Sequence, residues 1–373
     1  MLFSRAPSRL LPSRAPPNVC YPPAPPNVCC PPAPLTFAVL PRPQRCVLPA
    51  LAQSYSATEY ATRKVIFEKN KDLVLEHNAL YRAGEESWYA ALNHLADYTT
   101  EEFKTLRATK YDPTPFTVQG YSYSGTNPAS IDWRTKDVVT PVKNQGGCGS
   151  CWAFSATETV ESQYAIASGK LLTLAPQTYV DCVENPNSCG GTGGCEGATM
   201  ELAFNLTAKK GIALESDLPY KGRDATCPTY TPAVKATGYV KNPVNDAKGL
   251  ETALATKGPM SVTVAAEPWQ LYGGGLFKGC SKGGVFGTPD NTLDHGVQAV
   301  GYTADYWIVR NSWGAGWGES GYIRLDRSAD AQTFVDKHPA DGVACKPVPK
   351  TQTVGGECGV LFDTSYPTGV TAA

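Results

Sequence analysis

A short segment near the middle of the chain, Gln145-Gly-Gly-Cys-Gly-Ser-Cys-Trp-Ala153, constrains its fold and chemistry more than any other feature. Cys151 follows Ser150, a residue type that caps helices, and residues 152–161 have helical composition. A thiol in the first turn of a helix feels the positive end of the helix macrodipole, which favours the thiolate. Because the thiolate is the reactive form of cysteine, the segment predicts a nucleophile.

Two further motifs follow this segment in order. Cys148-Gly-Ser-Cys-Trp152 fits the C-G-[SA]-C-[WY] signature of papain and cathepsin enzymes, in which His and Asn lie about 130–150 residues downstream. His295 follows Cys151 by 144 residues, and Asn311, which begins an Asn-Ser-Trp-Gly motif, follows it by 160. The chain therefore resembles a papain-family, cathepsin L-like cysteine protease.

The resemblance implies a role for each of these residues. Cys151 is expected to attack the scissile carbonyl as a thiolate, and His295 to stabilise the thiolate and transfer protons. Asn311 is expected to orient the imidazole, as in other Cys-His-Asn sites. Gln145 is expected to donate its side-chain amide to the oxyanion. Trp313 is expected to cover the His–Asn hydrogen bond beside bound substrate.

The same residue types also occur in proteins of other functions. Cys148 and Cys151 form a CxxC pair, which elsewhere is a redox dithiol or half of a zinc site. Cys189 and Cys195 are too far apart for a second zinc ligand pair, and no short βαβ unit suggests a thioredoxin-like site. We expect neither a metal nor a cofactor. The alternative function is an inactive papain-like binding or storage protein, and the intact set of catalytic residue types disfavours it.

Composition limits the partners of the chain. Its formal net charge of −1 over 373 residues gives no reason to expect nucleic acid. No apolar run approaches the ~18 residues of a membrane-spanning helix. The resemblance implies protein or peptide substrates, the chain's own prodomain and cystatin-type proteins as inhibitors, and a monomer.

Thirteen cysteines are present, of which nine follow residue 147. Without Cys151 eight remain, a parity that fits four disulfides in an oxidising compartment. We therefore expect a lysosomal, vacuolar or secreted protein, although its targeting signal is atypical. The resemblance suggests the pairs Cys148–Cys195, Cys182–Cys227 and Cys280–Cys358. Cys189 and Cys345 remain, both in stretches longer than the family minimum, and we expect them to pair.

The composition divides the chain into four segments. Residues 1–52 are Pro-rich and contain no Asp or Glu, so they cannot bury enough apolar surface to fold. They are an atypical targeting segment, a disordered extension or a mistaken gene start. We expect an inhibitory prodomain at 53–110, a linker with the activation cleavage site at 111–126 and a papain-like peptidase domain at 127–373.

Two motifs support the prodomain. Six residues recur at steps of four, four, three, four and four, which places them on one helix face. They are Glu59, Arg63, Phe67, Asn70, Val74 and Asn78, and they match the Glu-Arg-Phe-Asn-Ile-Asn pattern of cathepsin L-type prodomains. Residues 91–97 resemble the second prodomain motif, Gly-x-Asn-x-Phe-x-Asp, with matches at Asn93 and Asp97. We expect Arg63 and Asp97 to make ionic contacts that hold the prodomain.

The peptidase region changes character midway. Helical patterns cover 151–168 and 197–209, and short β-rich runs, such as 260–264 and 306–310, dominate from about 255. Helices followed by strands indicate an α+β fold. The resemblance implies the papain-like arrangement of a helical left lobe and a β-barrel right lobe, with the cleft between them.

Specificity residues are expected from the resemblance alone. The strand that binds extended substrates corresponds to Gly197-Ala198, and Asp363 is expected at the base of the pocket for the residue two before the cut. Asp363 would then accept Arg or Lys there, beside the usual Leu or Phe; the alternative is that its carboxylate turns to solvent. No function is assigned to the insertion at 326–357, and occupancy of the glycosylation sequon at Asn205 is left open.

Overall fold

The computed structural model describes residues 55–107, 126–287, 291–342 and 345–373, all within one structural unit. The tail at 1–52 and nearly all of the expected linker at 111–126 lie outside these described residues. Across the described ranges, no helix is both long enough and apolar enough to cross a bilayer.

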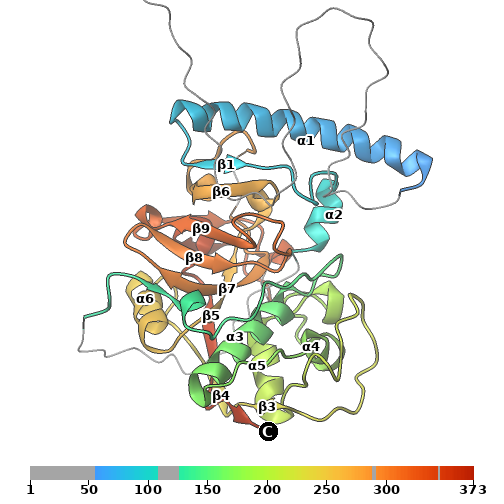
Figure 1. The fold of residues 1–373 in the computed structure, drawn as a ribbon, viewed down its shortest axis with the longest axis vertical. Coiled ribbons are helices and arrows are strands. Elements are labelled where there is room, and N and C mark those ends of the chain that lie inside the picture. The colour runs from blue at the N-terminus through green and yellow to red at the C-terminus, as the bar shows by residue number, and fades with distance from the viewer. Residues whose placement is uncertain (1–54, 108–125, 288–290, 343–344) are drawn as a thin grey trace, which may run out of the picture. The chain divides into compact units, whose positions relative to one another are not determined.

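The prodomain begins with one long helix, α1 (Ala57–Ala83) (Figure 1). Its first turn is capped by Ser56, whose hydroxyl accepts a hydrogen bond from the Glu59 amide at 3.3 Å. The helix ends at Gly84, where φ is 78°. This left-handed backbone favours glycine, so the helix terminates where the chain turns back.

The face of α1 that the sequence pattern predicts packs against the rest of the prodomain. Val74 is buried, and the Asn70 side chain donates to the Ala96 carbonyl at 2.8 Å. Asn78 both donates to and accepts from the main chain of Ala90 at 2.8 Å. The polar positions of the motif therefore hold the chain that follows α1 against the helix.

Arg63 makes a different ion pair from the expected one. Its guanidinium binds Glu102 of α2 (Thr100–Thr105) at 2.5 Å and reaches only the main-chain carbonyl of Asp97, at 3.0 Å. The Asp97 carboxylate accepts a hydrogen bond from the Tyr55 hydroxyl. Since Arg63 and Glu102 both lie in the prodomain, this pair joins α1 to α2. The expectation that Arg63 and Asp97 hold the prodomain to the peptidase domain is wrong.

The peptidase domain is helical first and rich in strands later. Its helices are α3 (Cys151–Ser168), α4 (Pro176–Cys182), α5 (Met200–Lys209), α6 (Ala247–Thr256) and α7 (Gly279–Lys282). Helices α3, α4 and α5 gather at one end of Figure 1 and share a core that includes Trp152, Tyr179 and Phe204. This group of helices is the left lobe.

The right lobe is a nine-stranded sheet in the order β1-β6-β9-β8-β7-β5-β12-β4, with β2 paired to β7. The strands are β1 (Trp88–Ala90), β2 (Ile131–Asp132), β4 (Gly238–Lys241), β5 (Met260–Val264), β6 (Tyr272–Phe277), β7 (His295–Tyr302), β8 (Tyr306–Arg310), β9 (Tyr322–Asp326) and β12 (Thr364–Thr368). All pairs are antiparallel except β6 with β9. A two-stranded sheet joins β3 (Val234–Lys235) to β13 (Thr371–Ala372).

Strand β1 belongs to the prodomain but completes the peptidase sheet. Trp88 lies opposite Gly275 of β6, and the Trp88 ring is buried against Phe277 at a centroid distance of 4.9 Å. A Cβ atom on Gly275 would lie 2.6 Å from the Ser87 carbonyl oxygen, so glycine allows the close approach. The prodomain is thus docked by backbone pairing as well as by apolar contacts.

The insertion at 326–357 forms a hairpin of β10 (Thr333–Asp336) and β11 (Gln352–Gly355). A disulfide between Cys189 and Cys345 attaches it to the left lobe, beside a hydrogen bond from the Lys346 amide to the Asn187 carbonyl at 3.2 Å. The other disulfides of the described residues are Cys148–Cys195, Cys182–Cys227 and Cys280–Cys358. The insertion, which lies in the chain between β9 and β12 of the right lobe, is therefore covalently tied to the left lobe as well.

Candidate active site

Cys151 is the first residue of α3 and lies outside the four disulfides. Its side chain is fully buried, and Ser150 occupies the N-cap position. The Ser150 carbonyl accepts from the amides of Ala153 and Phe154 at 2.9 and 3.1 Å, which starts the helix. The thiol therefore lies at the positive end of an 18-residue helix, a position that favours thiolate.

His295 is the first residue of β7, and its Nε2 lies 2.8 Å from Oδ1 of Asn311. The same oxygen accepts a hydrogen bond from the Ser312 amide at 2.7 Å, so it is held as an acceptor. Nε2 must then carry the proton, and Nδ1 makes no hydrogen bond with any described residue. The Trp313 ring stacks on the imidazole at 4.7 Å and covers this pair.

Helix α3, which begins at Cys151, packs against β7, which begins at His295. The hydroxyl of Ser155, one helical turn after Cys151, donates to the Val297 carbonyl at 2.8 Å. Val297 lies two residues after His295 on the strand. Cys151 and His295 thus come from opposite lobes, each as the first residue of one of two packed elements.

Gln145 is buried and held by Ser312. The main-chain amide of Gln145 donates to the Ser312 carbonyl at 2.9 Å, and the Ser312 hydroxyl donates to the side-chain oxygen Oε1 of Gln145 at 2.7 Å. Nε2 of Gln145 is thereby directed at two carbonyl oxygens, that of Cys148 at 3.0 Å and that of Leu106 at 2.9 Å. Leu106 belongs to the prodomain, so a peptide carbonyl of the prodomain occupies the amide donor.

Two more prodomain contacts close the site. Arg107 forms an ion pair with Asp294 at 2.6 Å, and Asp294 immediately precedes His295. The Phe103 ring of α2 packs edge-on against Trp313 at 5.2 Å, on the indole that covers the imidazole. Leu106, Arg107 and Phe103 together exclude solvent from the site.

The electrostatics of His295 reflect this closure. Burial lowers the pKa of His295 to about 3, the Asn311 bond opposes the shift, and the Arg107 cation adds to it. Desolvation disfavours the charged imidazolium, so the ring is neutral at neutral and mildly acidic pH in this state.

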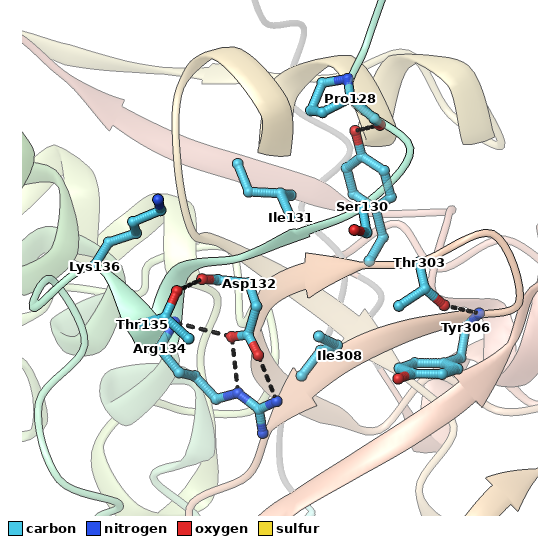
Figure 2. A pocket seen from close by; sticks show the side chains of 11 residues that line it. Pro128, Ser130, Ile131, Asp132, Arg134, Thr135, Lys136, Thr303, Tyr306 and Ile308 are labelled. Carbon is cyan, nitrogen blue, oxygen red and sulfur yellow. Dashed lines mark hydrogen bonds and ion pairs between the residues drawn. The ribbon is translucent and has the colours of Figure 1, made fainter.

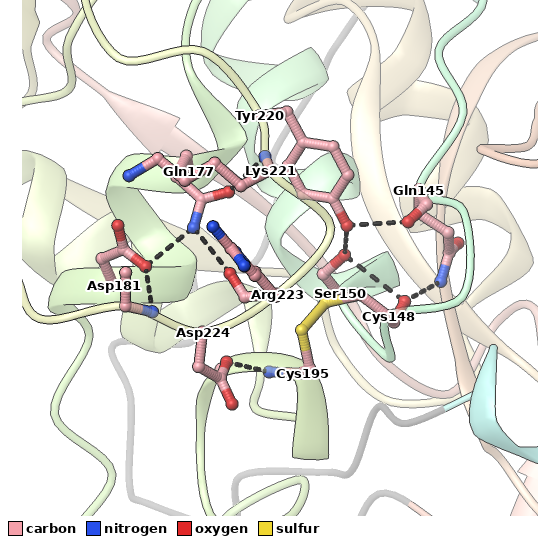
Figure 3. Close-up of a disulfide and its surroundings, with 12 residues drawn as sticks. Gln145, Cys148, Ser150, Gln177, Asp181, Cys195, Tyr220, Lys221, Arg223 and Asp224 are labelled. Atoms are coloured by element: carbon pink, nitrogen blue, oxygen red, sulfur yellow. Dashed lines mark hydrogen bonds between the residues drawn. A yellow bond between two sulfur atoms is a disulfide. The ribbon is translucent and has the colours of Figure 1, made fainter.

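The expected specificity residues fall into two places. Gly197 and Ala198 follow Cys195, whose sulfur is bonded to Cys148 of the loop before the nucleophile (Figure 3). Ala198 is fully buried, and the Gly197 carbonyl accepts from the Gly193 amide at 2.9 Å. The residues expected to bind the substrate strand therefore lie in the left lobe, beside the loop that precedes Cys151.

Asp363 is buried and already has a cationic partner. Its carboxylate lies 2.6 Å from Nζ of Lys241, which also lies 3.6 Å from Glu201. Thr263 of β5 donates its amide to the Asp363 carbonyl at 3.0 Å, and Thr263 lies opposite Gly296 of β7. Asp363 thus contacts the strand β5, which pairs with the strand that begins at His295. Its negative charge, however, is already paired with Lys241 of the same chain. This geometry argues against the expectation that Asp363 accepts Arg or Lys from substrate.

The structure also identifies site residues that the motifs did not. Ser312 and Tyr220 bond to Gln145, and Asp294, the residue before His295, pairs with Arg107 of the prodomain. Ser312 and Asp294 are neighbours of Asn311 and His295 in sequence, and that adjacency is the signal that was available. Tyr220 lies 75 residues from Gln145, and no sequence signal marked it.

The described residues contain two other features that resemble sites. A pocket of about 440 Å³ lies where the start of the peptidase domain meets β7 and β8 (Figure 2). It includes Tyr302 at the far end of β7, roughly 23 Å from His295 at 3.3 Å per residue, so it is separate from the catalytic residues. Cys280, Glu357 and Cys358 cluster like metal ligands, but their two sulfurs are bonded to each other.

Comparison with known proteins gives the class that this fold and site define. Residues 127–342 match the papain family cysteine protease profile, and residues 51–103 match the cathepsin propeptide inhibitor domain (I29). The chain belongs to the papain family of cysteine proteases and carries an inhibitory propeptide.

Individual relatives agree with this assignment. A cathepsin L-like proteinase of Phaedon cochleariae is 40% identical over 77% of this chain and 88% of the relative. Oryzain beta chain of Oryza sativa subsp. japonica is 39% identical over 83% of this chain but 62% of that longer relative. The structure of digestive procathepsin L 3 from Tenebrio molitor larval midgut aligns with a TM-score of 0.69 and 33% identity, covering 85% of this chain and 94% of that one.

Proposed function

We propose that the chain is the precursor of an endopeptidase that hydrolyses peptide bonds through Cys151, His295, Asn311 and Gln145. The observation that carries the proposal is the contact between Gln145 and Leu106. A side-chain amide next to the helical thiol binds a peptide carbonyl at 2.9 Å, which is the interaction required of an oxyanion donor.

The reaction follows from these positions. The Cys151 thiolate adds to the scissile carbonyl carbon, and the carbonyl electron pair moves to oxygen, where Gln145 Nε2 and the Cys151 amide donate. The His295 imidazolium protonates the leaving amine as the C–N bond breaks, which leaves a thioester on Cys151. His295 then takes a proton from water, and the hydroxide displaces the thiolate to release the acid. Asn311 holds the ring throughout.

The prodomain inhibits by occupying the same donors. The Leu106 carbonyl takes the place of a substrate carbonyl at Gln145, and the Arg107–Asp294 pair anchors the chain beside His295. The neutral imidazole of this state does not support a thiolate–imidazolium pair. The full-length chain is therefore the zymogen.

The domain boundaries are proposed as 53–110 for the prodomain, 111–126 for the cleaved linker and 127–373 for the mature enzyme. Contacts at the start of the mature segment support this division. The Asn127 side chain donates to Glu251 and Thr252 at 2.9 Å, and the Tyr302 hydroxyl donates to the Pro128 carbonyl at 2.9 Å. A cut just before Asn127 leaves these contacts in the mature domain.

The remaining properties are proposed because the chain belongs to the papain family. Adjacent histidines, which exopeptidases of this family use in an occluding loop, are absent from the sequence, so we propose endopeptidase activity. We propose a monomer that acts on protein and peptide substrates, binds cystatin-type inhibitors and has no nucleic-acid partner. Four disulfides in the described residues support an oxidising compartment, either lysosomal or vacuolar or outside the cell.

The test is a comparison of the activated enzyme with Cys151→Ser. Cys151→Ser is expected to abolish cleavage of a peptide amide and labelling by a peptidyl epoxide, while its thermal unfolding temperature stays the same. Equal turnover by both proteins would contradict the assignment of Cys151. An activated wild type that takes the epoxide at Cys151 but cleaves nothing would favour a binding role.

A further inference from the structure

The hydroxyl of Tyr220 connects the two ends of the loop that carries the nucleophile. We call residues 145–151 the nucleophile loop. The Tyr220 hydroxyl donates to the main-chain carbonyl of Gln145 at 2.7 Å and lies 2.7 Å from Oγ of Ser150 (Figure 3). A phenol has one proton, so Ser150 is the donor in the second bond. One side-chain oxygen thus links the residue that supplies the side-chain oxyanion donor to the residue before Cys151.

This use of Ser150 departs from what its position predicts. Ser150 is the N-cap residue of α3, yet its side chain makes no capping hydrogen bond to the helix. The first-turn amide donors of α3 are therefore not taken by the serine hydroxyl, which is directed to Tyr220. A capping serine bonds to the amide of the second or third helical residue, so the proposed oxyanion donor, the amide of Cys151 at the first helical position, does not depend on a cap, and the Ser150 hydroxyl can bond to Tyr220 instead.

The segment that carries Tyr220 is itself held tightly. The Tyr220 amide donates to Glu215 at 2.8 Å, and the adjacent Lys221 amide donates to Oε1 of Gln177 at 2.8 Å. The Tyr220 ring packs edge-on against Phe154 of α3 at 4.7 Å. Its hydroxyl is therefore fixed in position from the backbone and from the ring.

The same segment also supports the disulfide of the nucleophile loop. Asp224, four residues after Tyr220, accepts a hydrogen bond from the Cys195 amide at 2.7 Å, and Cys195 is bonded to Cys148 in the middle of the loop. Residues 220–224 thus hold the loop directly through Tyr220 and indirectly through the disulfide, as Figure 3 shows. Of these two supports, only the Tyr220 hydroxyl bonds both to Gln145 and to Ser150, the residue before Cys151.

We propose that Tyr220 is a positioning residue that sets the distance between the two oxyanion donors, the Gln145 side chain and the Cys151 amide. The proposal rests on the catalytic roles proposed above for Gln145 and Cys151. Hydrogen bonds to a developing oxyanion depend steeply on placement, so a looser loop weakens binding of the transition state more than binding of substrate. Burial raises the pKa of Tyr220 to about 12, so the hydroxyl keeps its proton throughout the working range.

The experiment compares activated wild-type enzyme with Tyr220→Phe, each corrected for active sites by titration. We expect kcat for a peptide amide to fall about tenfold with KM changed by less than about twofold, less than the ~10²–10³-fold cost of deleting an oxyanion donor. Affinity for a peptide aldehyde, whose hemithioacetal presents an oxyanion, should fall by a similar factor. Alkylation of Cys151 by iodoacetamide, which forms no oxyanion, should keep its rate.

Tyr230→Phe is the matched control. Tyr230 is also half-buried in the same lobe and donates its hydroxyl to a backbone carbonyl, that of Gly211 at 3.0 Å, but it does not contact the nucleophile loop. Equal kcat and equal aldehyde affinity in Tyr220→Phe and Tyr230→Phe would overturn the proposal. So would a loss confined to the alkylation rate, because Tyr220 would then act on the thiol.

Ser150→Ala covers the case in which Tyr220→Phe does not fold. It removes one of the two hydroxyl contacts, so we expect a smaller loss of kcat and aldehyde affinity, and unchanged values would contradict the proposal. Failure of the proposed function would give a different result from failure of this inference. In that case wild type and Cys151→Ala cleave the substrate equally, whereas failure of this inference leaves an active wild type.

Discussion

Arg107, at the end of the described prodomain, and Asp294, the residue before His295, form a 2.6 Å ion pair whose side chains are 5% and 10% exposed. The Asp294 carboxylate also accepts a hydrogen bond from the Ala266 amide at 3.0 Å, so it is held on the peptidase side. The pair places a prodomain cation next to the imidazole and lowers the pKa of His295 together with burial. The Arg107–Asp294 ion pair thus both anchors the prodomain and affects the protonation state of His295.

Arg107→Ala should weaken inhibition in the full-length chain. Truncating one partner of a buried charge pair costs about 2–5 kcal/mol, because the other charge is left unpaired. We therefore expect Cys151 in the precursor at pH 7 to react with iodoacetamide at least about tenfold faster. Lys104→Ala, an exposed basic residue on α2, is the control and should change nothing. An unchanged alkylation rate in Arg107→Ala would show that the ion pair does not hold the prodomain closed.

Activation should raise the pKa of His295. In the precursor, burial keeps the pKa at about 3, so the ring stays neutral as the pH falls to about 4. Removing Leu106 and Arg107 re-exposes the ring to water and removes a cation, and both changes favour imidazolium. NMR of histidine-labelled Cys151→Ala precursor, before and after an added protease cuts the linker and the prodomain is removed by chromatography, measures this directly. Identical titration of His295 in both forms would contradict the electrostatic account.

The mature domain should lose stability as the pH rises above 5. Burial raises the pKa of Glu357 to about 7, although it accepts a hydrogen bond from the Cys280 amide at 2.7 Å. The folded state therefore binds a proton more tightly than the unfolded state. This contribution to stability is complete below the unfolded pKa near 4.5 and is lost as the pH rises towards 7. The full shift corresponds to roughly 3 kcal/mol.

Glu357→Gln should reduce the slope of this dependence, because an amide does not titrate; burial also raises the pKa of Glu158 and Glu201, which keep part of the slope. The measurement is the unfolding temperature of enzyme blocked at Cys151, between pH 4.5 and 8. Glu267→Gln, at an exposed position, is the matched control and should retain the wild-type slope. If Glu357→Gln keeps the same slope as the wild type, the carboxyl of Glu357 does not carry the effect.

The substrate pocket that we expect at Asp363 should prefer Leu or Phe to Arg. Lys241 neutralises the carboxylate at 2.6 Å, so a substrate cation gains little there. Lys241→Met should release the charge and raise the Arg-to-Leu ratio of kcat/KM about tenfold, in keeping with a charge pair worth about 1.5–3 kcal/mol. Lys257→Met, at an exposed position, should leave the ratio unchanged. A wild-type preference for Arg would contradict the internal pairing.

Local patterns predicted much of the fold. Residues 151–168, 260–264 and 306–310 form the helix and strands expected from periodicity and composition. Helix α5 starts at Met200 instead of 197 because Gly197 has φ of 92°, which a helix does not permit. The helix propensities of the residues do not indicate at which positions a glycine adopts a backbone conformation that ends a helix.

The site was predictable only where chemistry depends on residue type. Cys151, His295 and Asn311 stand out because a nucleophile, a base and an amide recur in a known order. The Tyr220 and Arg107 contacts join segments 75 and 187 residues apart, and nothing local to either end records them. The Lys241 partner of Asp363 was missed for the same reason, since an ion pair depends on which strands become neighbours.

All eight half-cystines of the described residues lie between Cys148 and Cys358, and residues 55–107 contain no cysteine. A nick anywhere between 189 and 345 therefore leaves both fragments of the enzyme attached, whereas one cut in the linker turns the prodomain into a separate molecule. From then on inhibition obeys mass action. The prodomain rebinds in a concentrated compartment and is lost on dilution, so the volume into which the enzyme is released becomes part of its control.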